Sequence, residues 1–175
     1  MSAPYYISSV AFIYCDCIDP KVKYKAVRKD GIIAAIIYKK KVLLLKRRNL
    51  PIILNPGIWA FLSGGKEKGE SYLSVAYREV EEEISIKKQS LKLLYHTIVT
   101  ETEPRLKQKW PNHFYIFLSS TNKITLDIEN SDYRWATMRE LRNHVNYTNV
   151  FIGEDQILDK IGECVNGKLV AKRKN

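Results

Sequence analysis

Three glutamates in one short stretch are the residues of this sequence whose types and spacing could do chemistry. Glu79, Glu82 and Glu83 stand at positions i, i+3 and i+4. At about 100° per residue of an α-helix, they occupy one narrow arc. A divalent cation between them would remove their mutual repulsion, and Mg²⁺ prefers oxygen ligands of this kind. The alternative is a solvated acidic helix face, which is the usual interpretation of a run of glutamates.

A helix that would position these glutamates is predicted over Glu70 to Ile84, with Ser71 as its N-cap. Arg78 lies four residues before Glu82 and could pair with a carboxylate, which would hold it in one rotamer. Before the helix, Ser63 to Gly65 predicts a glycine-rich turn whose backbone can approach a phosphate. Beside the acidic arc runs an apolar stripe made by Leu73, Ala76, Val80 and Ile84.

The spacing of eight residues in this region resembles the Nudix box of MutT-type nucleotide pyrophosphohydrolases, G-x5-E-x7-R-E-U-x-E-E-x-G-U, where U is aliphatic. The matching positions are Gly64, Glu70, Arg78, Glu79, Val80, Glu82, Glu83 and Ile86. Eight defined positions at fixed spacing should recur by chance in a chain of this length on the order of once per million. The lead-in from Trp59 to Gly64 is similar to the W-x-F-P-G-G that members of the family often have.

Three residues depart from the family pattern. Leu62 replaces the usual proline, Ser63 replaces the first of the paired glycines, and Ser85 replaces the box glycine that turns the chain after the helix. Because serine tolerates a left-handed backbone less well than glycine, the turn at Ser85 is expected to be strained or of another type. None of these changes removes a carboxylate, so the sequence still predicts an active enzyme.

The resemblance implies a metal-dependent hydrolase that cleaves a diphosphate linkage in a nucleoside diphosphate derivative, such as ADP-ribose or a nucleoside triphosphate. It implies Mg²⁺ or Mn²⁺ as the cofactor and attack by water on phosphorus. The catalytic residues that it indicates are Glu79, Glu82, Arg78 and Glu129, and Glu70 is expected to support the metal shell. Glu79 would act as a ligand or as the general base. The metal ligands would be Glu79, Glu82, Glu83 and the backbone carbonyl of Gly64.

The general base is not fixed within this family, and two acidic residues outside the box are further candidates. Glu129 and Asp132 lie in the segment from Asp127 to Trp135, which we interpret as an acidic loop. Glu129 lies six positions before Trp135, as an acidic residue does in many members. The alternative, a solvated loop acid, has about equal support.

Substrate-binding candidates are less specific. Arg47 and Arg48 end a predicted strand and could bind a terminal phosphate or a base. Trp59 or Tyr115 could stack on a nucleobase, although core packing is the favoured interpretation of each. A polar loop, predicted over Glu101 to Asn112, could close over a nucleotide or could be an ordinary surface loop. Its residues of interest are Arg105, Lys107, Lys109 and Trp110.

The predicted elements mix strands and helices without regular βαβ alternation, which favours an α+β or mixed-sheet fold over a doubly wound sheet. The resemblance implies the Nudix fold, a mixed β-sheet sandwiched between α-helices. One domain is predicted over residues 1–175, with a Nudix core at 26–165 and an N-terminal strand extension at 1–25. The strands are predicted at Tyr5 to Cys15, Gly31 to Tyr38, Val42 to Leu45 (after a basic turn at Lys39 to Lys41), Trp59 to Phe61, Leu91 to Thr100 and His113 to Ser119. Further helices are predicted to begin at a capping box, Thr137 to Glu140, and over Glu154 to Cys164.

Composition narrows the class of protein. The 175 residues are 45% hydrophobic and 27% charged, a globular balance. No apolar run approaches the roughly 18 to 20 residues that a membrane span needs. The odd number of cysteines is a poor disulfide framework, so a cytoplasmic protein is expected. Cys15 and Cys17 are better interpreted as small residues near a strand than as metal ligands.

The net charge of +10 admits several anionic partners. A small nucleotide is the favoured one, because the sequence has no long basic helix or aromatic–basic array for nucleic acid. The first alternative is an RNA 5′-end or cap pyrophosphohydrolase, and the second is a catalytically silent nucleotide-binding module. No membrane partner is expected. The N-terminal strand could pair across a homodimer.

Overall fold

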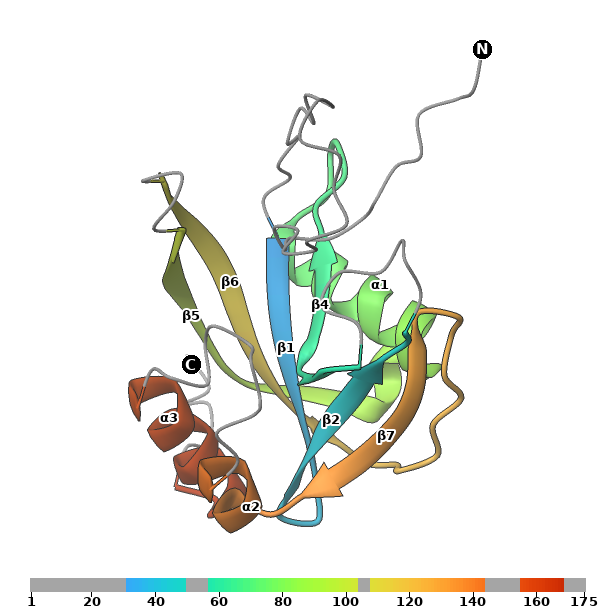
Figure 1. Cartoon of the computed structure of the whole chain (residues 1–175), viewed down its shortest axis with the longest axis vertical. Coiled ribbons are helices and arrows are strands. Elements are labelled where there is room, and N and C mark those ends of the chain that lie inside the picture. The colour runs from blue at the N-terminus through green and yellow to red at the C-terminus, as the bar shows by residue number, and fades with distance from the viewer. Residues whose placement is uncertain (1–30, 50–56, 104–107, 144–154, 169–175) are drawn as a thin grey trace.

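The computed structural model describes residues 31–49, 57–103, 108–143 and 155–168, and their side chains except at 100–110 and 155. A seven-stranded sheet lies at the centre (Figure 1), and helices cover both of its faces. Along the chain the elements are β1 (Gly31–Tyr38), β2 (Lys41–Arg47), β3 (Trp59–Ala60), β4 (Leu62–Gly65), α1 (Tyr72–Ile84), the 3₁₀ turn η1 (Lys88–Ser90), β5 (Leu91–Glu103), β6 (Gln108–Ser119), β7 (Asn130–Ala136), α2 (Met138–Asn143) and α3 (Asp155–Val165).

The sheet is mixed, and its central strand changes partner along its length. The strand order is β3-β2-β1-β6-β5, with β4 paired to β1 and β7 paired to β2. β1 runs parallel to β6, whereas it is antiparallel to β2 and β4. Its first half, Gly31 to Ala34, pairs with β4, and its last two residues pair with β2. β2 splays away from β1 below β4 (Figure 1), and α1 lies beside β4, where it contacts both β4 and β1.

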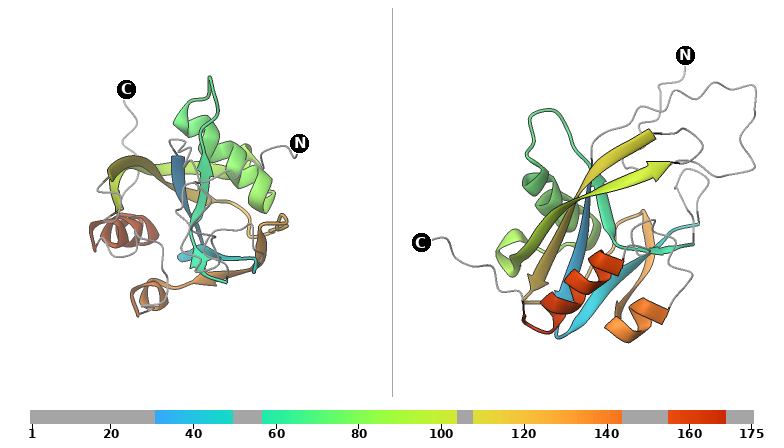
Figure 2. Two further views of the ribbon diagram at one scale, coloured as in Figure 1. Left: turned by 45° about the horizontal axis from the view of Figure 1, so that its top comes forward. Right: turned by 90° about the vertical axis from the view of Figure 1, so that its left-hand side faces the viewer.

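Two apolar cores explain why β1 is a continuous apolar run. Ile33, Ala35 and Ile37 face one cluster, which includes residues of α2 and α3. The alternate residues Ile32, Ala34 and Ile36 face the other cluster, beneath α1. A strand that is buried on both faces needs apolar residues at every position. Figure 2 shows α1 and α3 on opposite sides of the sheet, so the predicted fold, a mixed sheet between helices, is confirmed.

Local signals predicted several elements correctly. Ser71 caps α1, because its hydroxyl accepts the backbone N–H of Ser74 at 3.1 Å. The predicted basic turn joins β1 to β2 through Lys39 and Lys40, whose φ angles of 43° and 63° suit a two-residue hairpin turn. The capping box before α2 is also confirmed, since the Thr137 hydroxyl accepts the N–H of Glu140 at 3.2 Å. The C-terminal helix is confirmed as α3.

Two predicted loops are wrong. The Ser63 to Gly65 turn is part of strand β4, whose partner is β1, from Gly31 opposite Gly65 to Ala34 opposite Leu62. The acidic loop before Trp135 becomes strand β7 from Asn130 onward, and β7 pairs with β2. In both places, pairing with a strand distant in the sequence overrides the local preference of glycine and polar residues for turns.

The polar loop predicted over Glu101 to Asn112 is also mostly strand. β5 continues to Glu103 and β6 starts at Gln108, and their register extends from Leu91 opposite Ser119 to Glu103 opposite Gln108. The two strands support each other through cross-strand pairs, so polar side chains do not end them. Among the candidates in this segment, Arg105 and Lys107 lie outside the described residues, and the side chains of Lys109 and Trp110 lie outside the described side chains.

The predicted strand Tyr5 to Cys15 lies outside the described residues, so the N-terminal extension and the domain boundaries stay predictions. Within the ranges that the structure describes, no helix is long and apolar enough to cross a membrane.

Candidate active site

Two of the three box glutamates are buried on the side of α1 that faces the sheet. Glu79 is 8% and Glu83 is 5% exposed, while Glu82 is exposed. That all three carboxylates share one metal site stays a prediction, because Nη1 of Arg78 contacts both Glu79 and Glu82 at 2.9 Å. What differs is the exposure of Glu82 to solvent. Its place on the helix explains this result, because Glu82 is the member of the acidic arc farthest from the apolar stripe.

Glu79 can pack closely against strand β4 because residue 64 is a glycine. A Cβ atom added to Gly64 would lie 2.0 Å from the carboxyl carbon of Glu79, which no pair of real atoms could tolerate. Gly64 has an ordinary backbone and belongs to β4, so this position needs glycine for the close approach of Glu79 and not for a turn. The buried carboxylate thus lies directly against the strand that precedes the helix.

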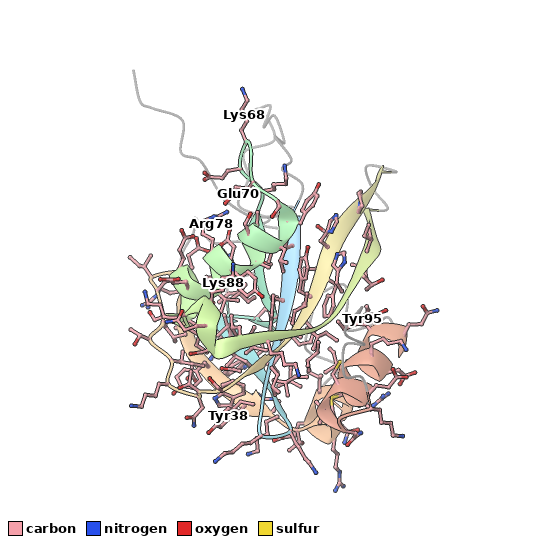
Figure 3. All side chains as sticks on the ribbon, turned by 180° about the vertical axis from the view of Figure 1, so that it is seen from behind. Tyr38, Lys68, Glu70, Arg78, Lys88 and Tyr95 are labelled. Atoms are coloured by element: carbon pink, nitrogen blue, oxygen red, sulfur yellow. The ribbon has the colours of Figure 1, made fainter. Side chains whose placement is uncertain are left out.

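Arg78 joins the loop before α1 to the acidic residues on it. Its Nε and Nη2 atoms donate to the two carboxylate oxygens of Glu70 at 2.8 and 3.1 Å, and Nη2 also donates to the carbonyl of Gly65 at 3.0 Å. Its Nη1 atom donates to Glu79 and Glu82, each at 2.9 Å. The predicted pairing of Arg78 with a carboxylate is confirmed (Figure 3). These bonds lower the pKa of Glu70, chiefly through Arg78 itself.

Glu83 is held by a residue that the sequence analysis did not identify. The Asn130 side-chain amide donates to Glu83 at 2.9 Å and to Asp127 at 3.0 Å. The Asp127 carboxylate in turn accepts the backbone N–H groups of Glu129 and Asn130 at 3.1 and 3.2 Å. An aspartate that accepts from the N–H groups two and three residues further on makes an Asx turn, and Asp-x-Glu-Asn is the sequence signal that could have identified it.

Glu129 and Arg47 lie in the same part of the structure as Glu83. The guanidinium of Arg47 pairs with the Glu129 carboxylate at 3.4 Å, and its charge also lowers the pKa of Glu83 against the effect of burial. Arg48 instead donates to the backbone carbonyls of Ile128 and Asn130 at 2.7 and 3.0 Å. Arg48 therefore fastens the segment that carries Glu129, and its predicted role in substrate binding stays a prediction.

The remaining candidates lie elsewhere. Trp59 packs against the core cluster of the α2–α3 face, near the side chains of Lys46 and Arg134. Tyr115 is 4% exposed, so core packing is its observed role. Asp132 is exposed on β7 and accepts the N–H of Tyr133. The structure does not bring these three candidates to the buried glutamates.

The buried carboxylates repel one another. The pKa of Glu79 is raised to about 7, chiefly by burial, with the charges of Glu82 and Glu129 adding to the rise and Arg78 opposing it. Burial also raises the pKa of Glu83 to about 8, with Glu79 contributing and Asn130 opposing. The pKa of Glu129 is raised by burial as well. Mutually repelling carboxylates with hard oxygen donors fit a divalent cation such as Mg²⁺.

These residues suit a divalent cation because they offer carboxylate oxygens as ligand atoms. In the described part of the chain, no three acidic, histidine or cysteine side chains converge as a ready-made ligand cluster. Arg78 occupies part of the space between these carboxylates, because its Nη1 atom donates to both Glu79 and Glu82.

Solved structures share this architecture. An Ap4A hydrolase of C. elegans, in a binary complex, superposes with a TM-score of 0.63 at 18% identity, over 80% of this chain and 99% of that one. The NUDIX domain of Shewanella oneidensis NrtR, complexed with ADP ribose, gives a TM-score of 0.55 at 19% identity, over 85% and 94% of the two chains. At these identities the similarity establishes the fold.

Sequence comparison establishes the family. The model of the NUDIX domain matches residues 28–158, so the chain belongs to the Nudix family. It is thereby an enzyme of the pyrophosphohydrolase class, which acts on phosphorus-containing anhydrides. An RNA pyrophosphohydrolase of Pelagibacter ubique is 26% identical over 155 residues, which cover 79% of this chain and 94% of the relative. One from Francisella tularensis is 32% identical over 108 residues, which cover 51% of this chain and 68% of the relative.

Proposed function

We propose that this enzyme hydrolyses a diphosphate linkage in a nucleoside diphosphate derivative, such as ADP-ribose or a nucleoside triphosphate, with a divalent cation on the acidic residues of α1. The observation that carries the proposal is the burial of Glu79 and Glu83 one helical turn apart. Burying two carboxylates costs stability, and strongly shifted pKa values in such positions are typical of functional sites. The metal would be held by Glu79, Glu82, Glu83 and the Gly64 carbonyl.

The residues around the proposed metal ligands fix their positions. Arg78 holds the Glu79 and Glu82 carboxylates and ties them to the loop through Glu70. Asn130 holds the Glu83 carboxylate from β7. When bound, Mg²⁺ would neutralise phosphate charge and lower the pKa of a bound water. Rigid support of this kind keeps reacting groups within the short range of positions that hydrolysis requires.

Two residues are candidates for the general base. Glu79 has a pKa raised to about 7, close to the value at which a base both exists in its charged form and accepts a proton readily near neutral pH. Glu129 is the second candidate, because its pKa is also raised and Arg47 orients its carboxylate. Comparing the pH profiles of kcat for Glu79→Gln and Glu129→Gln would separate the two roles. The variant that lacks the base should lose the ascending acidic limb of the profile.

The proposed function is tested by a product assay over nucleoside triphosphates, ADP-ribose and dinucleoside polyphosphates, with Mg²⁺, with Mn²⁺ and with EDTA. We expect cleavage between phosphorus atoms that requires the metal and stops with EDTA. Cleavage that continues unchanged in EDTA would overturn the metal assignment. If none of these compounds is cleaved, the small-nucleotide assignment fails.

RNA with a 5′-triphosphate is the second candidate substrate. Two observations favour it: both of the relatives named above are RNA pyrophosphohydrolases, and the chain carries a net charge of +10. The test is the kcat/KM for a 5′-triphosphate oligoribonucleotide beside that for each small nucleotide, at one salt concentration. A higher value for the RNA than for every small compound would replace the first candidate by the second.

A further inference from the structure

A row of aromatic side chains lies on the flank of α1 that faces β5 and β6. Tyr72 at the start of α1 stacks on His113 of β6, with ring centroids 3.6 Å apart and planes within 10°. The His113 ring neighbours His96 of β5 at 5.1 Å, and His96 stacks on Tyr115 at 4.5 Å. Phe117 and Tyr77 continue the row at centroid separations of 6.0 and 5.1 Å. We call Tyr72, His113, His96, Tyr115, Phe117 and Tyr77 the aromatic row.

The aromatic row has a buried floor and an accessible part. Tyr115 and Phe117 are buried, whereas Tyr72 and His113 are half-buried and His96 is exposed. Nε2 of His96 lies 2.9 Å from Nδ1 of His113, and the two imidazole planes are within 13°. This hydrogen bond holds the two rings side by side as one flat surface. Ile98, which lies opposite His113 in the sheet and is 55% exposed, extends the accessible apolar area.

Positive charge lies at both ends of the row. The ammonium group of Lys66 is 5.4 Å from the centre of the Tyr72 ring, and that of Lys88 is 4.9 Å from the Tyr77 ring. No member of the row is acidic. Figure 3 shows Glu70 and Arg78 on the other flank of α1, away from β5 and β6. Aromatic rings on which bases stack, together with cations that attract the backbone, are the two components of single-stranded nucleic-acid sites.

We propose that the aromatic row binds single-stranded RNA, as the part of the strand that follows the 5′ end. This inference rests on the second candidate of the proposed function. Two features favour a strand over a single nucleotide. The accessible part offers several rings in sequence, whereas one base needs one ring. In addition, cations lie at both ends of the row, so a backbone that runs along it meets positive charge at each end.

The test measures the binding of a short 5′-hydroxyl oligoribonucleotide by fluorescence anisotropy, with EDTA present. This probe has no phosphoanhydride, so its binding does not depend on hydrolysis. Each stacked base lost should weaken binding by roughly 5-fold to more than 100-fold. We expect that loss for His96→Ala and for Tyr72→Leu. Lys66→Ala should reduce the slope of log K against log salt by about 0.7.

The matched control is Tyr133→Leu, which removes an exposed tyrosine from β7, outside the aromatic row. It should leave the affinity unchanged. Melting temperatures and the rate of small-nucleotide cleavage show whether each variant folds. Unchanged affinity in both His96→Ala and Tyr72→Leu, or no binding by the wild-type protein, overturns the inference even if hydrolysis is intact. If the protein cleaves none of the substrates but its RNA binding depends on the aromatic row, the inference about the row stands. The proposed function is then the part that is wrong.

Discussion

The two faces of the sheet are covered by helices of similar kind but carry different interiors. The α2–α3 face buries an apolar cluster, to which α3 contributes Ile157, Leu158, Ile161 and Cys164. The α1 face also has an apolar cluster, but the same helix buries Glu79 and Glu83 beside it. One face therefore contributes stability alone, whereas the other gives up stability to keep two charged groups in position. We assign the chemistry to the α1 face, where burying two carboxyl groups costs stability.

The largest expected effect concerns the glutamates of α1. Glu82→Gln and Glu83→Gln keep the size of the side chain but remove its charge, so each should lower the metal-dependent rate by about a hundredfold or more. The measurement is kcat with saturating Mg²⁺ on the best substrate.

The control for this pair is Ile161→Val on the α2–α3 face. It should cost roughly 0.5 to 1.5 kcal/mol of unfolding free energy and leave kcat unchanged. If both glutamine variants keep the wild-type rate, the assignment of the site to α1 is wrong.

The next effect compares one glycine on each face. Gly64→Ala places a Cβ against the Glu79 carboxyl group, so the carboxylate must shift. A displacement on the order of 1 Å at a catalytic group should lower kcat by roughly ten- to a hundredfold.

Gly162→Ala on α3 is the matched change, because its Cβ would meet the side chains of Met138 at 3.7 Å and Arg142 at 3.9 Å, which are ordinary contacts. It should raise the unfolding free energy by roughly 0.5 to 1 kcal/mol, since alanine favours a helix interior. Equal kinetic effects of the two substitutions would contradict the difference between the faces.

A third prediction concerns the stability of the metal-free protein as pH changes. The pKa values of Glu79 and Glu83 are raised in the folded state, from 4.5 to about 7 and about 8. Their contribution is fully present below about pH 4.5 and is lost as the pH rises through 7 and 8, because the folded state holds protons that the unfolded chain has released. Thermal unfolding in EDTA should show at least about 1 kcal/mol of loss, or about 2 to 4 °C, between pH 5 and pH 9.

Glu83→Gln should flatten this decline, and added Mg²⁺ should restore stability at the alkaline end if the cation binds there. Glu163→Gln, at a half-buried residue of α3 that pairs with Lys160, should leave the decline as it is. Stability that increases over the same range would contradict the raised pKa values.

The smallest expected effect is at the end of α1. Ser85 has a left-handed backbone, with φ 58° and ψ 23°, and its hydroxyl makes one long hydrogen bond of 3.4 Å to the Thr125 carbonyl. Ser85→Gly should therefore hold the melting temperature or raise the unfolding free energy by up to about 1 kcal/mol, with kcat unchanged. A clear fall in melting temperature would mean that the hydroxyl contact outweighs the backbone strain.

The sequence predicted those parts of the molecule whose causes are local. The Ser71 cap and the apolar stripe of α1 depend on neighbouring residues, and the β1–β2 hairpin depends on its own short turn. Strand β4 could not be predicted in this way, because a glycine run becomes a strand only when β1 pairs with it.

The same division applies to the candidate site. The spacing of the glutamates could be recognised in the sequence. The contact of Asn130 with Glu83 could not, because the two residues lie 47 positions apart. The outward position of Glu82 depends on Arg78 and on the packing of the helix against the sheet. Contacts of this kind follow from the fold, which the local pattern does not contain.

The left-handed residue at position 85 has a consequence for how this family is recognised. A consensus written in amino-acid letters demands glycine there and counts this chain as a mismatch, although the backbone adopts the conformation that glycine would serve. What the position requires in this chain is a pair of dihedral angles. Searches that score this site by backbone conformation, with serine admitted at a small penalty, should recover distant members that a glycine-only consensus leaves out.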